Sequence, residues 1–214
     1  MRRNSVLAAL AAVALLAAGC DKNATAPSAH ALESADAALL AEELDALTGA
    51  ALSAGIGSAV LFSEIPANGA PLPIDRSFTS TRRCPGGGSV AMAGTTKGEV
   101  DMAARSLTLE TSATRTESAC AFPTRRAGGA TLTVDGNPNV AIRASHKLVG
   151  GQPVGPQTTT QKGAFKWSAS DGRSGSCTLD LTSTVDFATL TYSVKGMMCG
   201  QAVDVTKKGV QPER

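Results

Sequence analysis

Aromatic side chains are scarce in this 214-residue chain, in which five Phe, Trp167 and Tyr192 together make up 3% of the residues. Sites for carbohydrates and for single-stranded nucleic acids usually stack their ligands on exposed aromatic rings. The chain has few such rings to offer either ligand class.

Motifs that carry known chemistry are also missing. The sequence contains no G-x-S-x-G elbow, no H-E-x-x-H helix, no phosphate loop and no paired glycosidase carboxylates. The short C-x2-4-C spacings that zinc sites use do not occur either. We therefore predict no catalytic residues, no metal, no cofactor and no enzymatic activity.

One long apolar run is present, from Ser5 to Ala18, and it follows the basic pair Arg2-Arg3. A permanent membrane helix needs about 20 apolar residues to cross the roughly 30 Å hydrocarbon core, so this run is too short. A basic start, an apolar run and small residues in that order are typical of an export signal that is later removed.

The end of this run, Leu16-Ala17-Ala18-Gly19-Cys20, resembles the lipobox of bacterial lipoproteins, although Ala17 stands where the family usually has Leu. The resemblance implies cleavage before Cys20 by signal peptidase II and a diacylglycerol on the Cys20 thiol. Two or more acyl chains give stable anchoring. The resemblance therefore places the chain in the bacterial cell envelope, anchored to the inner or the outer membrane and facing the periplasm or the cell surface.

Four further cysteines fit an exported protein: Cys84, Cys120, Cys177 and Cys199. An even number in an oxidising compartment indicates two disulfides, for which three connectivities exist. We favour Cys84 with Cys120 and Cys177 with Cys199, because a meander of strands would bring each pair to the same end.

Charge is balanced overall but unevenly distributed. Removal of Arg2 and Arg3 with the signal leaves 18 basic against 18 acidic residues, which argues against a nucleic-acid partner. The segment 31–64 holds six acids and no base, whereas residues 65–214 hold 17 bases and 11 acids. Two alternatives follow: the acidic segment lies against the basic remainder, or it is a solvated helix that spaces the domain from the membrane.

The organisation that we predict has five parts: signal peptide 1–19, tether 20–30, amphipathic helix 31–54, Pro/Gly-rich linker 55–75 and antiparallel β domain 76–214. Five leucines fall on one side of the helix: Leu32, Leu39, Leu40, Leu44 and Leu47. Asp36 and Glu43 share that side, so each needs a partner such as Arg if the side is buried.

Alternating apolar and polar residues between turn signals predict eight strands in the β domain, at about 77–84, 89–97, 105–118, 130–135, 139–149, 157–169, 176–186 and 189–199. The fold class is mainly β: an eight-stranded antiparallel meander that closes into a barrel or forms a strongly curved sheet, preceded by one amphipathic helix. Seven groups form the inward face: Val90 and Met92; Leu107 and Leu109; Leu132 and Val134; Val140, Ile142, Ala144 and Leu148; Phe165 and Trp167; Leu179, Leu181 and Val185; Leu190, Tyr192 and Val194.

The last hairpin contains a conflict of one residue. Placing Cys177 directly opposite Cys199 sets Leu181 across from Lys195, whereas the alternation sets Leu181 across from Val194. A β-bulge at Gly196 would reconcile the two, because glycine accepts a positive φ. Without a bulge between Tyr192 and Cys199, either the disulfide or the face assignment should be wrong.

Three residues are candidates for a ligand site or a polar interior: His146, Trp167 and Tyr192. His146 shares its strand face with apolar residues, which is more typical of a hydrogen-bonded rim or core residue than of a general base. Cys84-Pro85-Gly86-Gly87-Gly88 and Gly163 to Trp167 resemble only uncharacterised exported β-rich bacterial proteins, which implies no activity.

Three functions remain open. The first is an envelope lipoprotein of structural or assembly type that has the lipid bilayer and an envelope protein as partners. The second is a lipocalin-like binding module for a small apolar ligand or lipid, which requires an inward cavity. The third is a hydrolase that uses His146, which requires a nucleophile within hydrogen-bond reach of that side chain.

Overall fold

The computed structural model describes residues 32–61, 70–124, 129–136 and 139–209, which form one helix and eleven strands. The lipobox and the tether lie outside these residues. The elements are α1 (Ser34–Leu61), β1 (Leu72–Arg83), β2 (Ser89–Asp101), β3 (Ser106–Ser118), β4 (Cys120–Pro123), β5 (Thr131–Asp135), β6 (Val140–Val149), β7 (Gln152–Pro153), β8 (Gln157–Ala169), β9 (Ser174–Asp186), β10 (Thr191–Met198) and β11 (Gln201–Lys208).

All strands belong to one antiparallel sheet with the order β1-β2-β3-β6-β8-β9-β10-β11. The β4–β5 hairpin attaches through β5 to the end of β8, and β7 pairs with β6. The mainly β class and the antiparallel meander are thus confirmed. Eight strands were too few: β4 and β7 are too short to show alternation, whereas β11 carries an alternating pattern at Val203 and Val205 that we overlooked.

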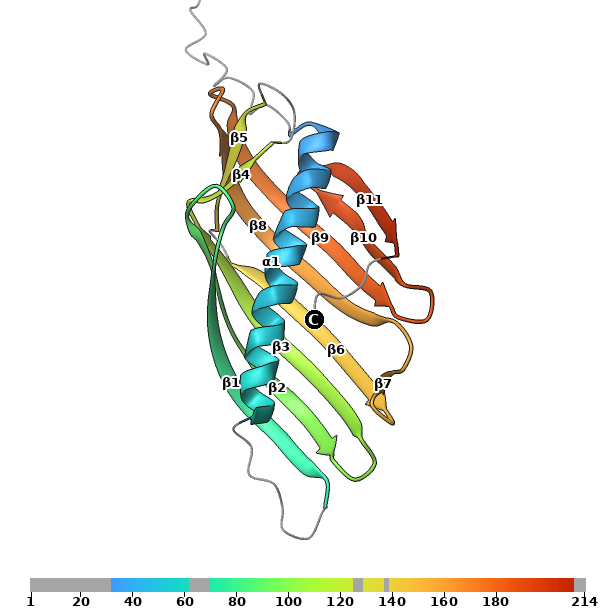
Figure 1. The fold of residues 1–214 in the computed structure, drawn as a ribbon. Helices are drawn as coiled ribbons and strands as arrows, with labels where there is room; N and C mark the ends of the chain where they lie inside the picture. The colour runs from blue at the N-terminus through green and yellow to red at the C-terminus, as the bar shows by residue number, and fades with distance from the viewer. Residues whose placement is uncertain (1–31, 62–69, 125–128, 137–138, 210–214) are drawn as a thin grey trace, which may run out of the picture.

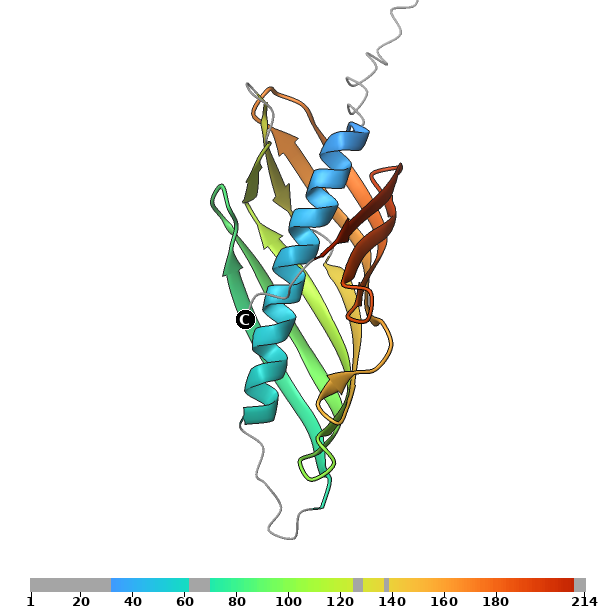
Figure 2. The ribbon, with the colours of Figure 1, turned by 45° about the vertical axis from the view of Figure 1, so that its right-hand side comes forward.

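The sheet does not close into a barrel. Its edge strands β1 and β11 stay apart, and α1 lies across the inner face of the curved sheet between them (Figures 1 and 2). The helix contacts β1 and β2 on one side and β10 and β11 on the other. Strand alternation predicts which residues face inward, but not whether the edges meet or a helix separates them.

The helix is longer than predicted, because it continues through Gly55 to Leu61 instead of ending at residue 54. Gly55 is buried, and a methyl group there would overlap the ring of Phe78 on β1. This glycine therefore marks a close approach of helix and strand rather than a linker. The predicted linker 55–75 is also too long at its other end, since β1 begins at Leu72; Pro73 is tolerated there because β1 is an edge strand.

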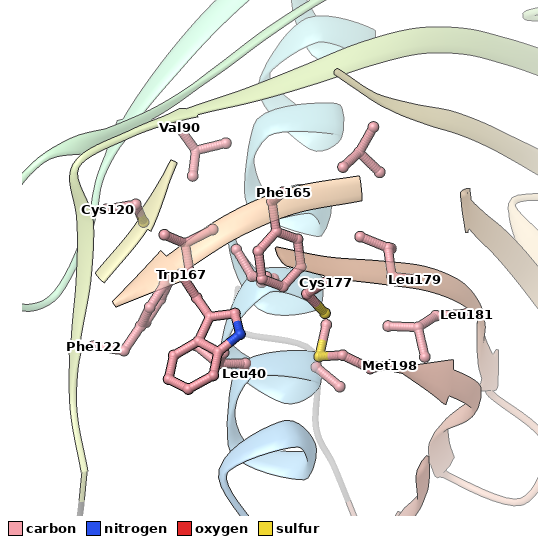
Figure 3. Close-up of a cluster of buried hydrophobic side chains, with 14 of the residues drawn as sticks. Leu40, Val90, Cys120, Phe122, Phe165, Trp167, Cys177, Leu179, Leu181 and Met198 are labelled. Carbon is pink, nitrogen blue, oxygen red and sulfur yellow. The ribbon is translucent and has the colours of Figure 1, made fainter. Parts of the chain in front are cut away.

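Helix and sheet share one hydrophobic core, so the helix is part of the β domain. In Figure 3, Leu40 of α1 lies with Phe165 and Trp167 of β8 and with Met198 of β10. Each such aliphatic or aromatic side chain contributes about 1.5–3 kcal/mol on full burial. The inward face is largely as predicted; Leu190 is the exception, with 45% of its surface exposed in the β9–β10 turn.

The acidic helix lies against the sheet and forms ion pairs with its bases. Arg173 in the β8–β9 turn lies 3.4 Å from the Asp36 carboxylate and 3.9 Å from that of Glu33. Lys207 of β11 pairs with Glu42. Asp36 is buried and has the arginine partner that its position required, whereas Glu43 is only half-buried. Of the two alternatives for the acidic segment, the solvated spacer is therefore wrong.

Both favoured disulfides, Cys84–Cys120 and Cys177–Cys199, are present. The bulge at Gly196 is not, because β9 and β10 stay in one register from Thr191↔Asp186 to Met198↔Leu179. Cys199 lies just after β10 and has a φ of 53°. This backbone turn at the end of the strand accommodates the one-residue difference between the disulfide and the strand alternation. The disulfide and the face assignment therefore both hold. Gly196 stands opposite Leu181, where a Cβ would overlap the Asp180 carbonyl oxygen.

Candidate functional sites

A cluster of polar side chains is buried between α1 and the inner face of the sheet. Its members are Asp45 and Thr48 on α1, Arg115 and Glu117 on β3, Gln161 on β8 and Tyr192 on β10. Tyr192 is half-buried, and the other five are buried. Sequence reasoning identified only Tyr192, although Arg115 and Glu117 occupy inward positions of β3, two and four residues beyond Ala113.

Arg115 is at the centre of this cluster. Its Nε donates to Glu117 Oε1 at 2.6 Å, and its Nη1 donates to Thr48 Oγ1 at 2.6 Å and to Gln161 Oε1. Gln161 Nε2 in turn donates to Asp45 Oδ1 at 2.5 Å. A continuous chain of hydrogen bonds thus joins the middle of α1 to β3 and β8.

The Asp45 carboxylate is the last member of this series of hydrogen bonds. Tyr192 donates its hydroxyl to Asp45 Oδ2 at 2.6 Å. Burial raises the pKa of Asp45, and hydrogen bonds from Tyr192, Ser183 and Gln161 and the Arg115 charge oppose this rise. Burial, together with the charges of Asp45 and Glu42, also raises the pKa of Tyr192.

The cluster joins the helix to the sheet by hydrogen bonds. Thr48 donates its hydroxyl to the Leu44 carbonyl at 2.7 Å. Its proton is thus directed at a backbone oxygen rather than at a general base. Within the described part of the chain, Arg115 Nη2 and Glu117 Oε2 are buried without a hydrogen-bond partner.

His146 lies on the inner face of β6, opposite Leu109 of β3. Burial lowers the pKa of His146, which the Glu110 charge and the Gln157 side chain partly oppose. Its Nε2 is buried without a partner, and no hydrogen bond joins His146 to a serine, threonine or cysteine of the described residues. The nucleophile that a His146 hydrolase requires is therefore not in place there.

The three candidate residues do not form one site. Trp167 is in the core near the end of β8 that pairs with β5, and Tyr192 belongs to the polar cluster. His146 lies beyond the part of β6 that pairs with β8. The four disulfide cysteines are structural, and Cys20 lies outside the described residues.

Exposed apolar side chains gather at one end of the sheet, which we call the distal end. It is formed by the β2–β3, β6–β8 and β9–β10 connections, opposite the start of α1 (Figure 1). Of the five large apolar side chains exposed in the described residues, Met102, Val154 and Leu190 are in these connections, and Val149 is the last residue of β6 before one of them. Sequence reasoning missed this, because no periodic pattern extends into turns.

The distal connections are neighbours in space. Gly151 donates its backbone N–H to the Arg105 carbonyl at 2.7 Å, which joins the first two connections. Pro156 lines a groove together with Thr184 and Thr189, which joins the second and the third. The connections that carry the exposed apolar side chains are therefore next to one another, and we call these four side chains the rim.

No group of three or more His, Cys, Asp or Glu side chains among the described residues is placed to hold a metal ion. No helix in the same residues has both the length and the apolar character needed to cross a bilayer. Comparisons of this chain with protein-family models, with curated proteins and with solved structures found no match.

Proposed function

We propose that this chain is a lipid-anchored, non-catalytic module of a bacterial envelope, and that its distal end binds an envelope protein. The observation that carries the proposal is the position of the exposed apolar rim at the end of the sheet opposite the start of α1. Exposed apolar groups that cluster instead of scattering are typical of interaction surfaces.

The geometry of the anchor is consistent with this proposal. The 28-residue helix is about 42 Å long at 1.5 Å per residue. The tether from Cys20 to Ala31 spans at most about 43 Å when fully extended. A tether attached at the start of α1 would therefore leave the distal end free to reach away from the anchoring membrane.

A protein fits the rim better than a second bilayer does. Side chains that lie at membrane interfaces are enriched in Trp and Tyr, and none of the four exposed rim residues is aromatic. Met, by contrast, is enriched at protein interfaces. The neighbouring charges, among them Asp101, Arg105 and Lys147, have both signs, which gives no general attraction to anionic lipid.

Site-specific photo-crosslinking in the source bacterium tests the proposal. A photoreactive residue placed at Met102, Val154 or Leu190 should give the same protein adduct from all three positions. Thr160 and Thr182 are matched controls, because they are exposed on the sheet away from the rim and should give none. No adduct at the rim, or the same adducts at the controls, would contradict the proposal.

A small apolar ligand is the second candidate, favoured by the incomplete burial of the inner face around His146. Leu107, Leu148, Val185 and Phe187 are only half-buried there, whereas inward residues nearer the start of α1 are fully buried. The unpartnered His146 Nε2 would bind the polar group of such a ligand. Native mass spectrometry should then detect a co-purified ligand that is lost in Leu148→Gln; recovery of ligand-free protein from its native membranes would exclude this candidate.

A further inference from the structure

Three lysine–aspartate pairs on the outer face of the sheet stand directly opposite each other on adjacent strands and form ion pairs. The three pairs are Asp75–Lys97 at 3.0 Å, Lys162–Asp180 at 2.8 Å and Lys195–Asp204 at 3.4 Å.

Asp186 and Lys208 lie on the same outer face but are one strand too far apart to form such a pair. Asp186 on β9 and Lys208 on β11 both stand opposite Thr191 of β10, which separates them. Two strand spacings of about 4.8 Å put their backbones roughly 10 Å apart. In the described part of the chain, neither side chain forms an ion pair, so an anion and a cation flank a hydroxyl-bearing strand.

A groove of about 440 Å³ occupies this place on the outer face, within the range of small-molecule sites. Its lining consists of Pro156, Thr184, Asp186, Thr189, Thr191, Ser193 and Lys208. Hydroxyl groups thus lie between the two charges. Thr189 donates its hydroxyl to Thr191 Oγ1, and Thr191 donates to the Thr189 carbonyl, so these two side chains offer acceptors, whereas Thr184 and Ser193 offer donors and acceptors to a polar ligand.

The carboxylate in the groove is held in position. Asp186 Oδ1 accepts the Ala188 amide at 2.9 Å and the Thr189 amide at 3.3 Å. Hydrogen bonds from the Thr189 side chain and from these amides lower the pKa of Asp186, so that it stays ionised at neutral pH. The turn therefore presents a fixed negative charge at one end of the groove.

We propose that this groove binds short peptides with free termini, with the ammonium group at Asp186 and the carboxylate at Lys208. A tripeptide extends over at most about 10 Å, which matches the separation of the two strands that carry the charges. The intervening hydroxyl groups bind the peptide amides and carbonyls. The site goes beyond the proposed docking of an envelope protein and does not depend on the anchor.

Titration of the mature chain in detergent with Ala-Ala-Ala, followed by the NMR signals of backbone amides, tests this proposal. We expect saturable shifts at Thr184, Thr189, Thr191 and Ser193 with a millimolar Kd, because exposed charge pairs are individually weak. The doubly blocked N-acetyl-Ala-Ala-Ala-amide, which has no terminal charges, should bind at least about fivefold more weakly.

Variants of Asp186 and Lys208 test which side chain binds which terminus of the peptide. Asp186→Asn should abolish the preference for a free amino terminus, and Lys208→Gln should abolish the preference for a free carboxyl terminus. The matched controls Asp204→Asn and Lys195→Gln remove charges that are already paired with each other on the same face, and should leave the Kd unchanged within about twofold.

Absence of saturable shifts, equal binding of the blocked peptide, or equal effects of the control variants would overturn the proposal. The spectrum of each variant also shows whether it is folded, so that a misfolded variant is not mistaken for loss of binding. Failure here would leave the crosslinking result at the rim unaffected, so the two proposals can fail separately.

Discussion

Arg115 is the largest side chain that the fold buries completely, and it carries a charge. Its guanidinium group lies between the Glu117 and Asp45 ends of the polar cluster, through a direct bond to Glu117 and through Gln161 to Asp45. A buried charge is tolerated only when its partners stay in place. Arg115 is therefore the residue through which the polar side chains of α1 are joined to β3 and β8.

Replacing this arginine should destabilise the protein strongly. Arg115→Met fills a similar volume but leaves Glu117 buried without its partner, so the free energy of unfolding should fall by about 3–5 kcal/mol. Urea denaturation measures this. Arg143→Met on the outer face of β6 is the matched control and should change stability by less than about 0.5 kcal/mol. Similar effects of the two variants would show that the cluster does not fix the helix.

Asp45 predicts a pH dependence of defined sign. Its pKa is raised in the folded state above the ordinary 3.8, so between these values the folded state binds more protons than the unfolded state. The contribution of Asp45 to stability is therefore fully present below pH 3.8 and is lost as pH rises through its folded pKa. Compared with Asp45→Asn, the natural chain should lose stability as the pH rises above about 4. A natural chain that becomes more stable relative to Asp45→Asn as the pH rises would contradict this assignment.

At the scale of the element, α1 lies between the two edge strands, β1 and β11, which do not pair with each other to close the sheet into a barrel. It presents leucines and alanines to the core, polar groups to Arg115 and Gln161, and Gly55 to Phe78. Both edge strands therefore have α1 as a packing neighbour on the inner face of the sheet.

Two glycines of α1 should respond in opposite directions to the same substitution. Gly49 has open space around it, so Gly49→Ala should stabilise the protein by up to about 1 kcal/mol through helix propensity. Gly55→Ala gains the same propensity, but its methyl group overlaps the Phe78 ring, so we expect a net loss of about 1–2 kcal/mol. Thermal unfolding of the two variants decides; stabilisation by both would mean that the helix does not approach β1 closely.

The strands were easier to predict from the sequence than whether the sheet closes into a barrel. Alternation placed Leu132, Val134, Val140 and Ile142 inside correctly, because a period of two fixes the face of each residue. Closure depends on where the helix packs, which no local pattern encodes. The polar cluster left a signal, since Arg115 and Glu117 interrupt an inward-facing row, but their partners lie far away in sequence on α1 and β8.

At the scale of the whole molecule, the two disulfides tie the ends of strands that lie nearest the start of α1. Cys177 and Cys199 enclose a segment of 22 residues, and in a chain-entropy description such a crosslink stabilises by about 3 kcal/mol. Replacement of both by Ala should lower the free energy of unfolding by about that amount in chemical denaturation. A loss below about 1 kcal/mol would show that the fold does not rely on an oxidising compartment.

The mature amino terminus of the protein, isolated from its own membranes, tests the central claim most directly, because the arrangement of anchor and distal rim depends on it. Mass spectrometry should find that the chain begins at Cys20 and carries a diacylglycerol on the thiol. A chain that begins elsewhere, or that has an unmodified Cys20 thiol, would contradict the account.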